Sequence, residues 1–295
     1  MTLRIGINPL TWTNDDMPEL GGDTPLETCL AEASEAGYEG IEMGYKFPRT
    51  AAELGPILGR HGLALVSGWH SANLVEHTVE EEIAAVEDHL TLLAGMGCKV
   101  MVFAEAGGST HGRREAPIST RPQLADDEWG PYGERLTRIA EHLAARGVAM
   151  AFHHHMGTVI ETEEEVDRLM ACTGEAVGLL LDTGHLNFAG GDPVAVAARH
   201  GRRINHVHCK DVRADVLEKA RAGDMSVLDA VLDGVFTVPG DGAIDFAAVL
   251  AALRPFAYSG WLVVEAEQDP AKAHPLTYAR MGHEGLRSAL AAAGL

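Results

Sequence analysis

Residues 3–43 read LRIGINPLTWTNDDMPELGGDTPLETCLAEASEAGYEGIEM and contain one complete strand–helix–strand unit. The apolar runs at 3–8 and 40–43 predict strands, and the segment at 24–37 between them predicts a helix. We expect Thr24 as its N-cap, Pro25 at its first position, Glu27 in a capping box and Gly37 at its end. Two strands joined by a helix in this way are expected to run parallel.

The same unit recurs along the whole chain. Segments 78–97 and 162–174 again begin with Thr and acidic residues and end near Gly, which is typical of helices. Eight strand–helix units in 295 residues predict a (β/α)8 TIM barrel, with residues 1–295 as a single domain. A doubly wound open sheet is the alternative, but no GxGxxG motif follows the first strand. The predicted strands are 3–8, 40–43, 64–69, 100–105, 148–153, 177–182, 204–209 and 261–267.

Composition narrows the class of protein. Hydrophobic residues make up 46% and charged residues 22%, which is ordinary for a globular chain with a large core. The net charge of −20 makes nucleic acid an unfavourable partner. No apolar run reaches the roughly 18 residues of a membrane span, and the start MTLRIGINPL lacks the features of a signal peptide. Four cysteines without CxxC spacing favour reduced thiols, so we expect a cytoplasmic protein without a membrane partner.

Two long connections follow predicted strands, at 106–124 and 211–246. Long connections in compact domains are often functional, and barrel active sites are built at the carboxyl ends of the strands. Polar residues gather at those ends, and a buried imidazole or carboxylate there must be paired, coordinated or in a wet cavity. The residues concerned are Asn8, Trp12, Glu42, His70, Glu105, His153 to His155, Asp182, His185, His206, His208, Glu265 and Glu267.

Strand periodicity sorts some of these residues by face. His206 and His208 point the same way, as do Glu265 and Glu267, and Asp182 ends a run of leucines. Hydrogen-bonded core histidines, a turn-capping aspartate and a solvated strand end are the competing structural interpretations. A site with imidazole and carboxylate donors suits Mn²⁺, Co²⁺ or another divalent cation better than a structural zinc.

Two segments carry a more specific resemblance, NDDMPELGGDTPLETCL at 14–30 and HHHMGTVIET at 153–162. With LDTGH at 181–185 and HVHCKD at 206–211, they make the chain similar to the xylose-isomerase-like TIM barrels, and within them to the inosose dehydratases of inositol catabolism. The resemblance implies a hydro-lyase that converts a cyclic polyol ketone, 2-keto-myo-inositol (scyllo-inosose), into a trihydroxycyclohexane-1,2-dione. It also implies a divalent metal, and glutathione is an expectation from the family alone.

The resemblance and the strand ends together assign roles. Expected metal ligands are Glu161, Asp182, His208 and Glu265, with His153 or His155 as the alternative to Glu161 and Glu267 as the alternative to Glu265. Expected catalytic residues are Lys210, His155 and Glu267, and expected substrate contacts are His185, Arg213, His70, Trp12 and Glu105. His206 is expected to orient the ligands from a deeper position.

Other functions stay open at this point. A sugar or inosose epimerase or isomerase could use the same metal site and return the proton instead of eliminating water. A phosphodiesterase would need a basic groove, which the net charge of −20 disfavours. A sugar-binding module without turnover fits poorly with so many ionisable groups on one face. A homo-oligomer is allowed but not required by the sequence.

Overall fold

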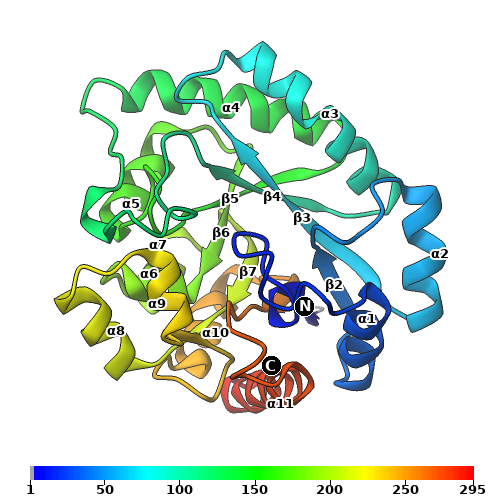
Figure 1. Ribbon diagram of the computed structural model, residues 1–295. Helices are drawn as coiled ribbons and strands as arrows, with labels where there is room; N and C mark the ends of the chain where they lie inside the picture. Colours follow the sequence, from blue (N-terminus) through cyan, green and yellow to red (C-terminus); the bar gives the residue numbers. More distant parts are fainter. Residues whose placement is uncertain (1–2) are drawn as a thin grey trace.

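Eight parallel strands close into a barrel in the computed structural model, which describes residues 3–295 (Figure 1). Their order around the barrel is β1-β10-β7-β6-β5-β4-β3-β2. The strands are β1 (Leu3–Ile7), β2 (Gly40–Met43), β3 (Ala64–Ala72), β4 (Val100–Glu105), β5 (Ala149–His153), β6 (Val177–Asp182), β7 (Ile204–Cys209) and β10 (Gly260–Val264). The TIM-barrel prediction is therefore confirmed, while residues 1 and 2 of the expected single domain lie outside the described residues.

Helices surround the barrel, and the main hydrophobic core lies between them and the strands (Figure 1). They are α1 (Leu26–Glu35), α2 (Ala51–His61), α3 (Val79–Gly95), α4 (Trp129–Ala145), α5 (Glu163–Cys172), α6 (Thr183–Phe188), α7 (Pro193–His200), α8 (Ala214–Ala222), α9 (Val227–Leu232), α10 (Phe246–Leu253) and α11 (Pro275–Ala293). Three short 3-10 helices also occur, at Pro9–Thr11, Ile118–Thr120 and Arg254–Phe256. None of the helices within residues 3–295 combines the length and apolar composition that a membrane crossing requires.

The predicted helix starts are partly correct. Thr78 and Thr162 both form complete capping boxes at the starts of α3 and α5. The prediction for Thr24 is wrong, because α1 begins at Leu26 and Pro25 is its N-cap, with no side-chain hydrogen bond. Pro25 is extended at φ −65° and ψ 148°, and its carbonyl accepts the first helical bond from the Thr28 amide (3.0 Å). The start therefore lies one residue later than the sequence pattern indicated.

The connection at 211–246 is structured. β8 (Asp211–Val212) pairs antiparallel with β9 (Phe236–Thr237), and α8 and α9 lie between them in the chain. A second hydrophobic cluster, which includes Val212, Leu217 and Phe236, packs this unit beside the barrel, and Met17 and Met156 belong to the same cluster. The connections that follow β1, β5 and β7 are thus held together at the carboxyl end of the barrel.

Candidate active site

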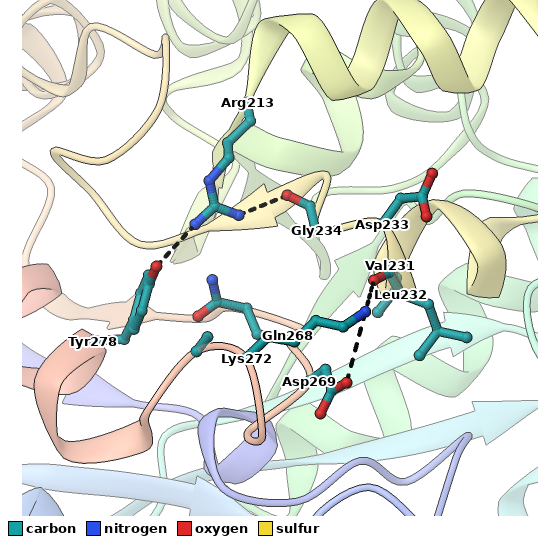
Figure 2. Close-up of a pocket in the computed structure, with 10 residues that line it drawn as sticks. Arg213, Val231, Leu232, Asp233, Gly234, Gln268, Asp269, Lys272 and Tyr278 are labelled. Atoms are coloured by element: carbon teal, nitrogen blue, oxygen red, sulfur yellow. Dashed lines mark hydrogen bonds and ion pairs between the residues drawn. The ribbon is translucent and has the colours of Figure 1, made fainter.

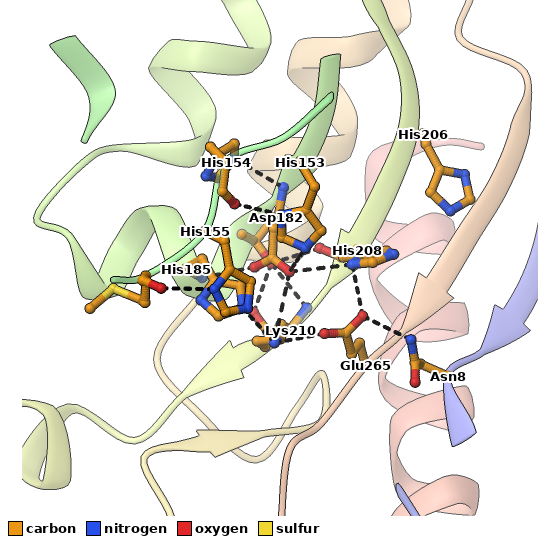
Figure 3. A network of polar contacts seen from close by, with 12 residues as sticks. Asn8, His153, His154, His155, Asp182, His185, His206, His208, Lys210 and Glu265 are labelled. Atoms are coloured by element: carbon orange, nitrogen blue, oxygen red, sulfur yellow. Dashed lines mark hydrogen bonds and ion pairs between the residues drawn. The ribbon is translucent and has the colours of Figure 1, made fainter. Parts of the chain in front are cut away.

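Four buried side chains from adjacent strands converge at the carboxyl end of the barrel (Figure 3). His153 ends β5, Asp182 ends β6, His208 lies in β7, and Glu265 directly follows β10. One donor atom from each lies within 4.8 Å of the others. Asp182 Oδ2 is 3.6 Å from His153 Nε2 and 3.5 Å from His208 Nδ1, and Glu265 Oε2 is 2.7 Å from His208 Nδ1. We call these four residues the metal cluster.

The donor atoms of this cluster fit a divalent cation. Asp182 Oδ1 accepts a hydrogen bond from the His185 amide (2.8 Å), but Asp182 Oδ2 is buried with no hydrogen-bond partner within residues 3–295. His208 Nδ1 is also buried, and its nearest acceptor is the Glu265 carboxylate at 2.7 Å. Buried polar atoms without partners are costly unless something else satisfies them. Two imidazole nitrogens and two carboxylates form a mixed nitrogen and oxygen set that divalent transition metals favour.

Glu161 does not belong to the metal cluster, in contrast to its expected role as a ligand. Its Oε2 accepts a hydrogen bond from the Gly157 amide (2.7 Å), and its Oε1 lies 3.4 Å from Arg121 Nε. The chain turns after β5, so Glu161 faces the backbone of that turn, and His153 holds the position beside Asp182. The alternative ligand His153 is therefore the one that the structure places in the cluster, together with Glu265.

Glu42, near the end of β2, lies outside the metal cluster and contacts one of its members, His208. Its Oε1 accepts from Ser67 Oγ (2.5 Å) and lies 2.8 Å from His206 Nε2 and 3.3 Å from His208 Nε2. Its Oε2 accepts from Asn8 Nδ2 (2.8 Å). Burial raises the pKa of Glu42, but His208 and His206 outweigh burial and hold that pKa well below its usual range. The carboxylate engages His208 Nε2 and so directs Nδ1 toward the cluster.

Lys210 is fully buried beside the cluster. Its Nζ lies 2.7 Å from Glu265 Oε1 and 2.8 Å from His185 Nε2, and it donates a short hydrogen bond to Glu267. Burial lowers the pKa of Lys210, but the carboxylates of Glu265 and Glu267 outweigh burial and raise that pKa above its usual value. Lys210 is therefore an ammonium group, which stabilises nearby negative charge and cannot act as a base in this state. The raised pKa also means that it gives up its proton less readily than a free ammonium group.

His155 differs from Lys210 in that its side chain is neutral and can accept a proton. Its Nδ1 lies 2.8 Å from the Met156 carbonyl, which requires that nitrogen to be the donor and leaves Nε2 with a free lone pair. Burial and the nearby His111 lower the pKa of His155 to about 3, so the ring is neutral near pH 7. Its ring lies over that of His185, with centroids 3.8 Å apart. His155 therefore has the charge state of a general base.

A cavity of about 310 Å³ reaches His155, Glu265 and Glu267. Asn8, Leu10, Asp15, Asp16, Met43, Trp69, Ser71, His111, His155, Glu265 and Glu267 line it. Three of these residues, His155, Glu265 and Glu267, had expected roles in the site, and Asn8 was expected at the same strand ends. The sequence did not single out Asp15, Asp16, Trp69, Ser71 or His111. Trp69 and Ser71 could have been found by strand alternation once Ser67, two residues earlier on β3, was known to face Glu42.

Three expected substrate contacts are engaged elsewhere. His70 faces α3, where its Nε2 lies 3.5 Å from Glu82 Oε2. Trp12 is buried and donates from Nε1 to Glu32 Oε2 (2.6 Å). The Glu105 carboxylate accepts from the amides of residues 74 and 107, at 3.0 and 2.9 Å, and so ties together the connections after β3 and β4. None of the three lines the cavity.

Arg213, a fourth expected substrate contact, lies in a separate pocket of about 420 Å³ (Figure 2). Its guanidinium donates to the Gly234 carbonyl (2.6 Å) and to Asp241 Oδ2 (2.7 Å). These bonds fix the β8–β9 unit and direct the side chain away from the metal cluster. By contrast, His185 lies beside Lys210, next to the cluster (Figure 3).

The closed barrel and the buried cluster define a class of protein, namely TIM barrels with a candidate metal-binding site at the carboxyl ends of the strands. The family model for the xylose isomerase-like TIM barrel matches residues 30–289, and the chain belongs to this family. A rhizopine catabolism protein of Rhizobium meliloti is 58% identical over 100% of this chain and 90% of its own length. An inosose dehydratase of Geobacillus thermodenitrificans is 47% identical over 97% of this chain and 96% of its own length. An inosose dehydratase of Lacticaseibacillus casei is 43% identical over 95% of this chain and 94% of its own length.

Solved structures share the fold at lower sequence identity. An L-ribulose 3-epimerase aligns with a TM-score of 0.69 and 19% identity, covering 100% of this chain and 97% of its own. The IOLI protein, solved with a bound zinc atom, aligns with a TM-score of 0.67 and 18% identity, covering 100% and 98%. At such identities the similarity supports the barrel architecture alone.

Proposed function

We propose that this protein is a metal-dependent hydro-lyase that removes water from an inosose, a polyhydroxylated cyclic ketone. Inosose dehydratases that match the chain over nearly its whole length support the reaction class. The observation that carries the proposal is the pairing of a neutral imidazole, His155, with a buried ammonium group, Lys210, beside one metal cluster. An elimination needs a base and an acid of these two kinds.

The proposed reaction assigns one proton transfer to each group. His155 Nε2 takes the proton from the carbon next to the ketone, and the electrons of that C–H bond form the new C=C bond. The hydroxyl on the adjacent carbon leaves as water with a proton from Lys210, and the resulting enol rearranges to the 1,2-dione. Glu267 holds the ammonium group in place through its short hydrogen bond. His185, whose Nε2 lies 2.8 Å from Lys210 Nζ and 3.5 Å from Glu267 Oε1, is proposed to contact the substrate.

His153, Asp182, His208 and Glu265 would hold the cation, and we propose Mn²⁺ or Co²⁺. When bound, a divalent cation supplies Lewis acidity that stabilises negative charge on the ketone oxygen. The test is to strip the protein with a chelator, restore Mn²⁺ or Co²⁺, and follow turnover of scyllo-inosose. Full activity without metal would contradict the proposal. Cytoplasmic location, a homo-oligomeric state and a thiol requirement stay predictions.

Product mass separates the proposal from its alternative. A dehydratase yields a product lighter than the inosose by one water, whereas an epimerase or isomerase yields a product of unchanged mass. The role of Lys210 is tested by Lys210→Ala, because near-normal kcat in this variant would exclude proton donation by the ammonium group. Lys210→Arg is a useful companion variant, since it keeps the positive charge but cannot readily give up a proton.

A further inference from the structure

The segment NDDMPEL at 14–20 forms part of the rim of the active-site cavity. The Asn14 side chain shapes it, because its Oδ1 accepts hydrogen bonds from the amides of Asp16 (2.9 Å) and Met17 (2.8 Å). The Asn14 amide in turn donates to the Leu20 carbonyl (3.2 Å). This closed turn presents two consecutive carboxylates, Asp15 and Asp16, to the cavity, and both line it.

A second connection faces this turn across the cavity mouth. His111, from the connection after β4, has its Nε2 3.9 Å from Asp16 Oδ1. The His111 ring also packs edge-on against the proposed base His155, with ring centroids 5.1 Å apart. Trp69 completes the polar wall with a hydrogen bond from Nε1 to Ser71 Oγ (2.7 Å). The rim carboxylates are thus part of the same cavity as the reacting groups.

The charges that line the cavity are of one sign. Four carboxylates line it, at Asp15, Asp16, Glu265 and Glu267, and no Lys or Arg is among its described lining residues. Glu265 and Glu267 both contact the ammonium group of Lys210 directly. Within residues 3–295, Asp16 pairs only with His111, and Asp15 has no ion pair. Lys210 therefore compensates the negative charge of the floor, whereas no ammonium or guanidinium group contacts the rim within residues 3–295. Burial and the neighbouring Asp16 raise the pKa of Asp15 to about 6, so its negative charge is complete only well above that pH.

We propose that Asp15 and Asp16 determine substrate class by accepting hydrogen bonds from ring hydroxyls and repelling anionic ligands. The substrate of this site is then an uncharged polyol ring, and phosphorylated or carboxylated sugars are excluded. Carboxylates suit the first task because each oxygen is a strong acceptor for O–H donors. They suit the second because like charges repel at close range, and at this exposed rim the repulsion is reduced by salt. The inference deepens the proposed function, but its binding test requires no turnover.

The experiment compares two probes that differ by one phosphate group, myo-inositol and myo-inositol 1-phosphate. Their affinities are measured by titration calorimetry on the full chain at constant Mn²⁺, at low and at high salt. We expect the wild type to bind the phosphate at least about tenfold more weakly, a typical cost of like-charge juxtaposition. We expect the ratio to fall toward one in Asp15→Asn/Asp16→Asn, and to fall in the wild type at high salt.

Glu19→Gln is the matched control, because Glu19 is an exposed carboxylate of the same segment that does not line the cavity. It removes one negative charge and should leave the ratio of affinities unchanged. The single variants Asp15→Asn and Asp16→Asn report each residue separately and secure the test if the double variant folds poorly. Wild-type binding of both probes with equal affinity would overturn the inference, as would an unchanged ratio in the folded rim variants.

The two proposals fail in different ways. If scyllo-inosose is not dehydrated but the affinities discriminate as expected, the proposed reaction is wrong and the rim inference stands. If scyllo-inosose is dehydrated but the ratio does not respond to the rim variants, the reaction stands and the rim inference is wrong.

Discussion

Substitution of Glu42 by Gln is expected to weaken metal binding although Glu42 is outside the metal cluster. The two carboxylate oxygens have different partners, since Oε1 faces Ser67 and His206 and Oε2 accepts from Asn8. His208 Nε2 lies between them, 3.3 Å from Oε1 and 3.2 Å from Oε2. An amide has only one acceptor oxygen, so in either orientation its NH₂ group faces a donor. Loss of a partner that orients a metal-binding histidine typically costs about 10–100-fold in metal affinity. That range corresponds to about 1.4–2.7 kcal/mol.

The assay is calorimetric titration of Mn²⁺ into chelator-treated protein, with circular dichroism to verify folding. The matched control is Glu105→Gln, because Glu105 is also a buried carboxylate at a strand end but contacts loop amides instead of the cluster. We expect Glu42→Gln to raise the Kd for Mn²⁺ and Glu105→Gln to leave it unchanged. A folded Glu42→Gln protein that binds Mn²⁺ as tightly as the wild type would refute the orienting role.

Further predictions concern ligands, the base and pH. His153→Ala should abolish tight Mn²⁺ binding, whereas Glu161→Ala should retain it; the opposite result would restore Glu161 as the ligand. His155→Gln should lower kcat on scyllo-inosose by about 10²–10⁴-fold, the usual contribution of a general base, and steady-state kinetics would contradict this if kcat stayed normal. Burial raises the pKa of Glu105 from 4.5 to about 7. Between these two pH values the folded protein therefore retains a proton that the unfolded chain has lost. The stability that this carboxyl contributes is complete below about pH 4.5 and is lost as the pH rises through about 7. The difference in Tm between wild type and Glu105→Gln should change across this range, and a constant difference would contradict the shifted pKa.

The sequence pointed to the strand-end residues of the site because strand ends can be read locally. Asp182 ends an apolar run, and the alternation of β7 places His206 and His208 on one face, where both contact Glu42. However, alternation shows only which residues of a strand share a face, and it does not show which of the two faces points into the barrel. On β3 the inward residues are Ser67, Trp69 and Ser71, so the prediction for His70 was off by one position.

Residues in connections were predicted less well. Glu161 was chosen as a ligand by its position in a motif, but the turn after β5 directs it to the Gly157 amide. Arg213 was expected to face the substrate, but the β8–β9 pairing directs it to Gly234 and Asp241. In both cases, the direction of the side chain is set by hydrogen bonds to residues that are remote in sequence or lie in a turn. Such bonds leave no periodic pattern in the sequence.

The sequence by itself determined the barrel and the face on which chemistry is placed, and the family resemblance added three of the four cluster residues as expected ligands. It could do so because the alternation of strands and the amphipathicity of helices are local properties of the chain. Only the tertiary structure decided that His153 completes the cluster, that Glu42 holds His208 from across the barrel, and that Asp15 and Asp16 form the cavity rim. These arrangements depend on the closure of the barrel and on the packing of connections against one another, which bring together residues that are far apart in the sequence.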